Sequence, residues 1–173
     1  MRITALAFAS ALMLTAGTAL AGQSVELYRL TPEATGESLG TVELSDTGFG
    51  LLLAPGLTGL KPGEHGIHIH TNPDCGPAKK DGRTVLGLAA GGHFDPEESG
   101  RHEGPYGQGH LGDLPVLWVS GDGSSSHPVQ APRLSIAAVQ GRALIIHGGG
   151  DNYSDDPAAL GGGGARVACG IIR

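Results

Sequence analysis

The chain has 173 residues, of which 31 are glycine and 11 are proline, and its formal net charge is −6. This length suits one domain with a hydrophobic core of its own. The acidic balance argues against nucleic acid or an anionic membrane surface as a partner. The glycine and proline content disfavours a helical protein, and the recurring Val, Ile and Leu segments disfavour disorder.

Residues 1–21 have the features of a secretory signal peptide. Arg2 supplies a positive start, an apolar run extends from Ile3 to Leu14, and Ala19-Leu20-Ala21 offers the small residues of a cleavage site. The apolar run is short for a membrane span, and no cysteine follows the cleavage point to carry a lipid. A buried N-terminal helix is disfavoured because the run has no polar face. We therefore expect an exported chain without a membrane anchor and a single mature domain over 22–173.

The next segments in chain order predict an all-β domain. Apolar or alternating stretches recur at Val25–Leu30, Leu39–Leu44, Gly48–Leu53, Gly66–His70, Leu114–Val119, Ala143–His147 and Arg166–Ile172. Turn sequences separate them, including Lys61-Pro62-Gly63, Asp81-Gly82 and Gly121-Asp122-Gly123. Because no window keeps a helical period over three turns, we expect a Greek-key β-sandwich or flattened eight-stranded barrel.

Two long glycine-rich stretches interrupt the strands, over residues 87–115 and 148–165. Loops of this length in a compact domain are usually functional. The second stretch contains the run Gly161–Gly164, which could be a flexible linker. A tightly turning loop is the better interpretation, because a strand-like segment follows at once.

The two cysteines, Cys75 and Cys169, favour a disulfide in an exported chain. The alternative is that both bind a metal as thiolates. That alternative is weaker because neither has a second cysteine nearby.

Two histidines, His68 and His70, flank a single isoleucine. Side chains two residues apart in a strand point to the same face, so both imidazoles face one side while Ile67 and Ile69 face the other. His65 has the parity of the isoleucines, and we interpret it as a structural, hydrogen-bonded residue. Two imidazoles on one face form half of a transition-metal site.

Further candidate ligands lie in or beside the long loops. They are His93, His102, His110, Asp113 and His147. Three nitrogens and one carboxylate oxygen suit a closed Zn²⁺ site, and four imidazoles without thiolate suit copper. Counting ligands therefore suggests two metals that share one histidine. His127 lies in a polar turn and is interpreted as a solvated surface residue.

On these motifs the chain closely resembles the copper/zinc superoxide dismutases in their bacterial periplasmic form. The matching stretches are His65–His70, Gly91–Pro96, His102–Pro105, Gly109–Pro115, Ile146–Asp155 and Leu160–Gly170. They cover most of the mature chain in a specific order and spacing.

The resemblance implies a role for each of these residues. His68, His70, His93 and His147 resemble the copper ligands, and His93, His102, His110 and Asp113 resemble the zinc ligands, with His93 as the bridge. Asp151 resembles the carboxylate that hydrogen-bonds one ligand of each metal, and an ordinary turn at Asp151-Asn152 is compatible with that role. Arg166 resembles the arginine at the mouth of the copper site rather than a plain surface residue. Cys75 and Cys169 match the family's disulfide.

The resemblance also implies an activity and a location. We expect disproportionation of superoxide to O₂ and H₂O₂ by alternate reduction and reoxidation of copper, with His93 and Arg166 as catalytic residues and one copper and one zinc per subunit. The resemblance implies a periplasmic location. Bacterial relatives are often dimers, so a homodimer is a possible assembly, and Trp118 could lie in the core or at an interface. Arg166 is the first candidate to attract the anion, and Lys79 and Lys80 are weaker ones.

Two other functions fit parts of the pattern. A periplasmic copper- and zinc-buffering protein is disfavoured because all seven ligand positions and Arg166 are present. A copper-only dismutase is disfavoured because His102, His110 and Asp113 are retained.

Overall fold

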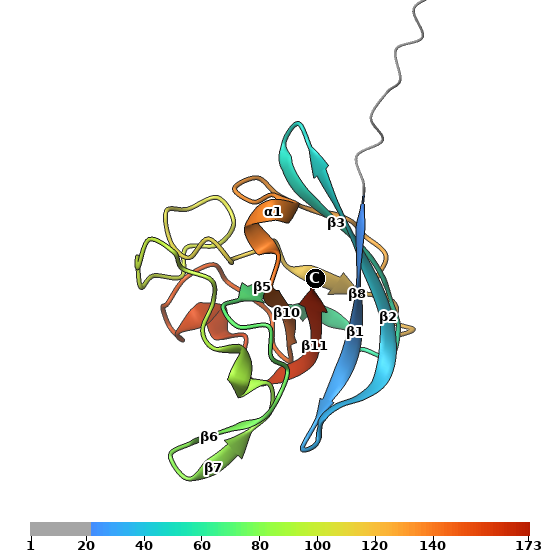
Figure 1. Ribbon diagram of the computed structural model, residues 1–173, viewed down its shortest axis with the longest axis vertical. Helices are drawn as coiled ribbons and strands as arrows, with labels where there is room; N and C mark the ends of the chain where they lie inside the picture. Colours follow the sequence, from blue (N-terminus) through green and yellow to red (C-terminus); the bar gives the residue numbers. More distant parts are fainter. Residues whose placement is uncertain (1–21) are drawn as a thin grey trace, which may run out of the picture.

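The computed structural model describes residues 22–173, so the expected signal peptide lies outside the described residues. The regular secondary structure of the described chain is almost entirely β-strand, as the sequence predicted (Figure 1). Its strands are β1 (Gln23–Thr31), β2 (Ala34–Thr47), β3 (Gly50–Leu57), β4 (Gly63–His65), β5 (Ile67–His70), β6 (Ala78–Lys80), β7 (Arg83–Val85), β8 (Leu117–Val119), β9 (Val129–Ala131), β10 (Arg142–His147) and β11 (Arg166–Ile172). Helix α1 (Ile136–Val139) and two 3₁₀ turns, η1 (Leu88–Ala90) and η2 (Leu160–Gly162), complete it.

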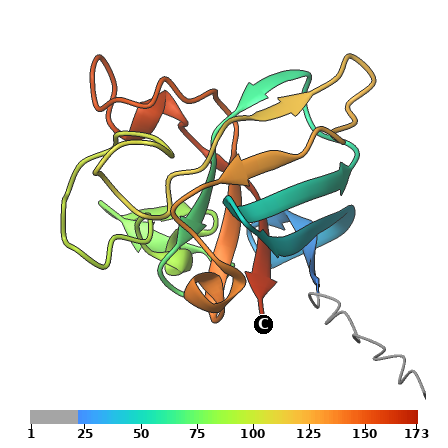
Figure 2. The same ribbon diagram turned by 90° about the horizontal axis from the view of Figure 1, so that it is seen from above.

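Seven strands form one antiparallel sheet in the order β5-β10-β11-β1-β2-β3-β9, and this sheet curls on itself (Figure 2). Strands β4 and β8 form a separate pair, and β6 and β7 form a hairpin that projects from the body. The first strand pairs with the last, which brings the two ends of the described chain into one sheet. The expected curled, all-β architecture is confirmed, with eleven strands in the described chain in place of the eight predicted.

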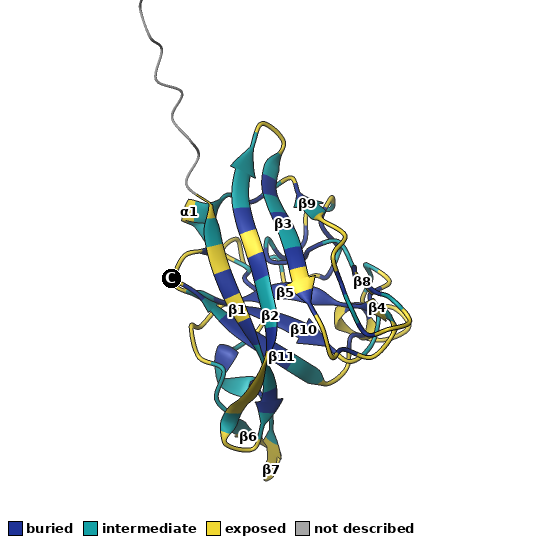
Figure 3. Ribbon diagram, turned by 90° about the vertical axis from the view of Figure 1, so that its right-hand side faces the viewer, coloured by how far each residue is buried: buried dark blue, intermediate teal, exposed yellow. Residues whose placement is uncertain are grey.

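The core lies inside the curl. Burial alternates along β1, β2 and β3, as period-two side-chain geometry requires (Figure 3). Strand β10 is instead buried on both faces. Leu144 and Ile146 join the main core, whereas Ala143 and Ile145 pack in a second cluster with Cys169. Within the described chain no helix is long and apolar enough to cross a membrane.

Several elements differ from the sequence prediction for identifiable reasons. Of the segment predicted over Leu114–Val119, only Leu117–Val119 forms a strand, because Pro115 has no N–H to donate to a ladder. The β6–β7 hairpin was missed because its strands carry charged rather than alternating apolar residues. Helix α1 has only four residues, and Ser135 Oγ caps it by accepting a hydrogen bond from the Ala138 N–H.

Candidate metal centre

Strand β5 carries the first two candidate ligands on one face. His68 and His70 are fully buried, and Ile67 and Ile69 belong to the main core on the opposite face. The predicted parity is therefore confirmed. Strand β5 pairs with β10 along one edge, with His68 opposite Ile145. Its other edge is free to receive the loops.

The first long loop occupies that other edge of β5. His70 forms a β-bridge with His93, and His68 forms one with Asp113. The Ile69 N–H donates to the Gly112 carbonyl at 2.9 Å, and the Phe94 N–H donates to the Ile69 carbonyl at 2.8 Å. Backbone pairing thus holds residues from two ends of the loop against the strand that carries the histidine pair.

His147 completes this arrangement from the end of β10. A register shift between Ile146 and His147 interrupts the pairing of β10 with β11 at that point. The His147 N–H donates to the Gly66 carbonyl at 2.8 Å, which fixes the residue beside β5. As the sequence predicted, its side chain lies where a strand gives way to a loop.

Side-chain atoms from these elements converge into two overlapping groups, in each of which one possible ligand atom per residue lies within 4.8 Å of the others. The four-histidine group contains His68, His70, His93 and His147. The histidine–aspartate group contains His68, His93, His102 and Asp113. His93 belongs to both groups, as expected of a bridge.

His110 adjoins the histidine–aspartate group without belonging to it. Its Nδ1 lies 3.4 Å from Asp113 Oδ1, and its ring centroid lies 5.3 Å from that of His93. His68 stands in its place within the 4.8 Å group. The predicted zinc ligands are nevertheless gathered around one carboxylate, that of Asp113.

The orphaned nitrogen atoms of these rings are suited to metal ions. Four buried ring nitrogens make no well-directed hydrogen bond within residues 22–173, and they are His68 Nδ1, His93 Nε2, His102 Nδ1 and His110 Nδ1. The last two face oxygens of Asp113 at 3.0 and 3.4 Å. His70 Nε2 and His147 Nε2 face each other at 3.4 Å. Buried polar atoms normally have a hydrogen-bond partner. A cluster of imidazole nitrogens without one therefore indicates that their lone pairs bind a cation. The residues present therefore fit copper and zinc.

The outward-facing nitrogens of the same rings are hydrogen-bonded. His68 Nε2 and His102 Nε2 each lie 2.7 Å from an oxygen of Asp151. His70 Nδ1 faces the Gly91 carbonyl at 3.0 Å, and His147 Nδ1 faces that of Gly164 at 3.2 Å. Because these partners only accept, the outward nitrogens carry protons. The inward nitrogens are the ones that would present lone pairs to a bound metal.

Asp151 is held by its own loop. The Tyr153 N–H donates to Asp151 Oδ1 at 2.8 Å. Gly161 has a φ of +68° and lies so close to Asp151 that a Cβ there would collide with the carboxylate. The glycine run is therefore a tight turn around Asp151, as predicted, and not a linker.

Burial keeps most of the imidazoles neutral. It lowers the pKa of His147 to about 3, and it lowers that of His93 to about 4 against a hydrogen bond to Asp113 that raises it. Burial, reinforced by the charges of His93 and Arg166, holds the pKa of His70 well below its usual range. Neutral imidazole is the form that binds metals.

The carboxylates reverse this effect at His102. Burial lowers the pKa of His102, but hydrogen bonding to Asp113 and Asp151 outweighs it and raises the pKa to about 9. The same contacts outweigh burial at the two carboxylates and hold their pKa values well below the usual range. The histidine–aspartate group therefore contains an ionised carboxylate, whereas the four-histidine group contains none.

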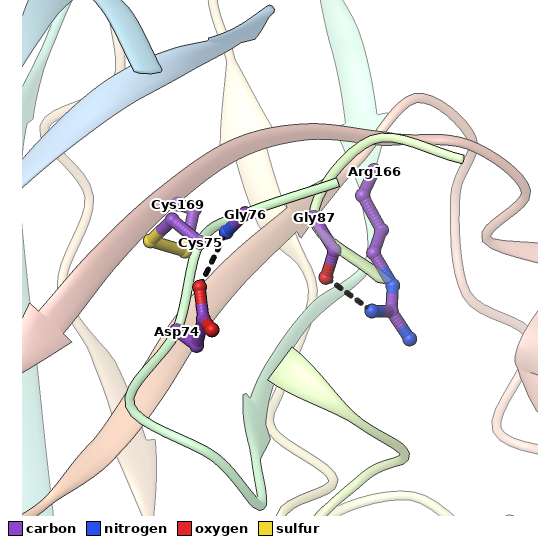
Figure 4. The surroundings of a disulfide bond; sticks show 6 residues. All are labelled: Asp74, Cys75, Gly76, Gly87, Arg166 and Cys169. Atoms are coloured by element: carbon purple, nitrogen blue, oxygen red, sulfur yellow. Dashed lines mark hydrogen bonds between the residues drawn. A yellow bond between two sulfur atoms is a disulfide. The ribbon is translucent and has the colours of Figure 1, made fainter. Parts of the chain in front are cut away.

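Arg166 lies at the start of β11 beside the four-histidine group. Its guanidinium donates to the Gly87 carbonyl at 2.5 Å (Figure 4). It also donates to the Gly91 carbonyl at 2.6 Å. Gly91 also faces His70, so one carbonyl connects the arginine with a candidate ligand. The side chain is partly exposed. Burial lowers the pKa of Arg166, but a guanidinium starts from so high a value that it keeps its charge.

Cys75 and Cys169 form a disulfide, as predicted from the sequence. The bond ties the loop after β5 to the middle of β11, three residues beyond Arg166 (Figure 4). Asp74 Oδ1 accepts a hydrogen bond from the Gly76 N–H at 2.7 Å and turns the chain at this point. A backbone hydrogen bond from the Ala89 N–H to the Gly76 carbonyl, at 3.1 Å, joins this loop to the segment that carries Gly87 and Gly91. The disulfide therefore lies beside the segment that supplies the carbonyl partners of Arg166.

The remaining histidines have the structural roles expected of them. The ring nitrogens of His65 lie 2.6 Å from the His147 carbonyl and 2.7 Å from the Lys61 carbonyl, in a buried position. His127 is exposed. Lys79 and Lys80 are also exposed, on the projecting hairpin. Trp118 is 50% exposed on β8, so it is not a core residue of this chain.

Two residues that support the site had no role assigned from the sequence. Asp155 Oδ2 accepts the His102 N–H at 2.8 Å, and Asp155 Oδ1 accepts the Leu160 N–H at 2.9 Å. Arg133 donates to the backbone of the loop between His102 and His110. Asp155 stood within a recognised motif, but nothing in the sequence around Arg133 indicated its contacts.

Comparison with known proteins gives the class of this fold and site. The family described as copper/zinc superoxide dismutase (SODC) matches residues 38–172. The structure of Cu/Zn superoxide dismutase from Brucella abortus has a TM-score of 0.87 and 48% identity, covering 88% of this chain and 100% of that one. The monomeric copper, zinc superoxide dismutase from Salmonella enterica has a TM-score of 0.80 and 55% identity, with the same coverage.

Curated sequences agree with these structures. Superoxide dismutase [Cu-Zn] 2 of Salmonella typhimurium is 55% identical over 163 residues, covering 94% of each chain. Superoxide dismutase [Cu-Zn] of Escherichia coli K12 is 49% identical over 164 residues, covering 94% of this chain and 95% of that one. The chain belongs to the copper/zinc superoxide dismutase family and is an oxidoreductase.

Proposed function

We propose that this chain disproportionates superoxide to O₂ and H₂O₂ and that the four-histidine group holds the copper. The observation that carries this assignment is the convergence of four buried imidazoles whose inward nitrogens lack partners or face one another. An all-nitrogen set accommodates both Cu(I) and Cu(II). When bound, copper supplies the one-electron change that each half of the reaction needs.

We assign the zinc to His93, His102, His110 and Asp113. These residues surround one buried carboxylate, and three of them belong to the histidine–aspartate group. Three nitrogens and one oxygen satisfy the tetrahedral preference of Zn²⁺ without leaving an open position. Zinc has no redox chemistry, so this half of the centre fixes His93 and sets its basicity.

His93 and Arg166 are assigned the catalytic roles. His93 Nδ1 faces Asp113 of the histidine–aspartate group, and His93 Nε2 has no hydrogen-bond partner within residues 22–173, so this one imidazole can link the two groups. Its Nε2 takes up and returns one of the two protons that hydrogen peroxide requires. Arg166, anchored on two carbonyls beside His70, attracts and orients the superoxide anion. Asp151 holds one ligand of each metal in the tautomer that directs its lone pair inward.

The location and assembly follow from the sequence features and the family. Residues 1–21 are assigned as a cleaved signal peptide, which directs the domain over 22–173 to the periplasm. The half-exposed Trp118 is a suitable contact for a homodimer. The related protein from Salmonella enterica is described as monomeric, so the oligomeric state of this chain is to be measured directly.

The assignment is tested on the mature chain loaded with copper and zinc, by superoxide turnover together with metal content. His147→Ala should abolish turnover and lower copper content while zinc is retained, and His110→Ala should lower zinc content first. His127→Ala, an exposed histidine, is the matched control and should change neither quantity. Stoichiometric metal binding without turnover would support a metal-buffering protein instead, and copper without zinc would support a copper-only enzyme.

A further inference from the structure

The loop that carries two of the assigned zinc ligands has little regular structure. The zinc loop, residues 100–112, contains no strand or helix. Only a few backbone hydrogen bonds hold it, such as the His110 N–H to the Arg101 carbonyl at 2.9 Å. Side chains from elsewhere must therefore fix its conformation. Without them, zinc binding would have to order the loop, and the lost conformational entropy would weaken the affinity.

One side chain, that of Arg133, supplies much of this support. Its guanidinium donates four hydrogen bonds to carbonyl oxygens of the zinc loop. The acceptors are Pro105 at 3.1 Å, Gly109 at 3.1 Å, Gly104 at 3.2 Å and His110 at 2.6 Å. These carbonyls come from both ends of the segment between His102 and His110, so one planar group ties the two ends together.

The positive charge of Arg133 is stabilised by the dipoles of these carbonyls and not by a carboxylate of the described chain. Among the described residues no carboxylate forms an ion pair with it. A guanidinium offers five N–H groups in a rigid plane, whereas an ammonium offers three donors from one point. Four separated carbonyls around one side chain are therefore a site shaped for arginine and not for positive charge in general.

Arg133 itself is fixed to the barrel. It follows β9, which pairs with β3 through Ala131 and Leu51. The next residue, Leu134, is buried in the main core. Beyond it, the Ile136 N–H donates to Asp46 Oδ1 at 2.8 Å. The guanidinium thus holds the zinc loop, which forms no strand pairing of its own, in a fixed position relative to the sheet.

We propose that Arg133 is a positioning residue for zinc, which preorganises His102 and His110 by clamping the backbone between them. The proposal rests on the zinc-ligand assignment made above. Asp155 holds the same loop at a different backbone group, because its carboxylate accepts the His102 N–H. Replacement of a residue that orients a metal ligand indirectly typically weakens metal affinity by about 10- to 100-fold.

The test measures zinc affinity of the metal-free mature chain by competition with a chromophoric chelator, for wild type, Arg133→Lys and Arg133→Gln. Both variants should weaken zinc binding by about 10- to 100-fold, with copper affinity at the four-histidine group within about threefold of wild type. The visible spectrum of Co²⁺ bound in place of zinc should lose intensity or shift in both variants, because the ligand geometry is relaxed.

Arg29→Gln is the matched control. Arg29 also donates to a loop carbonyl, that of Gly59 at 2.7 Å, but its loop carries no assigned ligand. The control should leave zinc affinity and the Co²⁺ spectrum unchanged. Zinc affinities of the Arg133 variants within twofold of wild type would overturn the proposal, as would equal losses of copper and zinc affinity with a lowered melting temperature. Failure of the wild-type chain to bind zinc, or unchanged zinc binding by His110→Ala, would instead overturn the ligand assignment itself.

Discussion

A single carboxylate, Asp151, joins the two halves of the metal centre. Its oxygens accept from one ring nitrogen of His68 and one of His102, both at 2.7 Å. Each ring is thereby left with its Nδ1 pointing inward, and neither can rotate without breaking a charge-assisted hydrogen bond. The residue fixes tautomer and direction together, which is why a buried, unprotonated acid is placed here.

The raised pKa of His102 leads to a prediction about zinc binding. Without metal, its pKa of about 9 means that the ring is mostly protonated at pH 8. Zinc must replace the proton on Nδ1, whereas His93, with a pKa of about 4, is already neutral. Zinc binding at pH 8 should therefore release about one proton from His102, and zinc affinity should rise with pH until about pH 9. Calorimetric titration in buffers of different ionisation enthalpy measures this release.

Asp151→Asn provides the comparison for that measurement. The amide removes one of the two negative charges that raise the pKa of His102, so the variant should release fewer protons at pH 8. Asp122→Asn is the matched control, because Asp122 is an exposed turn residue that bonds Ser124. Equal proton release from wild type and Asp151→Asn would contradict the explanation.

At the level of elements, β5 is the base of the centre because both of its edges are used. Strand β10 brings His147 along one edge, and the first long loop brings His93 and Asp113 along the other. The isoleucines on its far face anchor it in the core. Ligands on a short, doubly paired strand have less freedom than ligands on a loop, which favours a preformed site.

The disulfide is the second element-scale feature with a measurable consequence. It closes a loop of 94 residues in sequence, for which the chain-entropy model gives about 4–5 kcal/mol. Replacing both cysteines, Cys75→Ala with Cys169→Ala, should lower the free energy of unfolding of the metal-free chain by about that amount. Turnover should fall as well, because the disulfide lies beside the segment that supplies the carbonyls for Arg166. Urea unfolding monitored by circular dichroism gives the first quantity.

Reduction of the wild-type disulfide is the control for this experiment. A phosphine reductant should reproduce the loss of stability in the wild-type chain and have no effect on the double alanine variant. If the double variant is as stable as the oxidised wild type, the loop is held by packing and not by the covalent bond.

At the scale of the whole molecule, an acidic protein must attract an anion. The chain carries a formal net charge of −6, which opposes the approach of superoxide at long range. Local fields decide the encounter when a cation lies at the mouth of a partly buried site. Arg166 is such a cation, and its charge is balanced by carbonyl oxygens and not by an ion pair within residues 22–173.

Replacing this charge should change both the rate and its dependence on salt. Arg166→Ala should lower kcat/KM by about tenfold or more and flatten the decrease of the rate with ionic strength. Arg166→Lys keeps the charge and should keep most of the salt dependence. Lys80→Ala, on the exposed hairpin, measures any contribution from distant charge. A salt dependence unchanged in Arg166→Ala would exclude the steering role.

Much of the centre is written locally in the sequence. Strand parity alone separates His68 and His70 from Ile67 and Ile69, and spacing alone places His93 next to a loop rich in ligands. These features depend on neighbours in the chain, where backbone geometry is sufficient to fix direction. The all-β class follows for the same reason, because alternation of side chains is a local property.

Other features depend on contacts that no local pattern encodes. The hydrogen bonds from Arg133 to the zinc loop join residues 23 to 29 positions apart in sequence, and the bond between Asp155 and His102 joins residues 53 positions apart. The short charged strands β6 and β7 were missed because they lack an apolar pattern, although the Asp81-Gly82 turn between them was identified in the sequence. The sequence by itself determined which residues could bind the metals and on which face of β5 they lie. Only the tertiary structure decided what holds them there, because hydrogen bonds between distant segments form only once the sheet has curled.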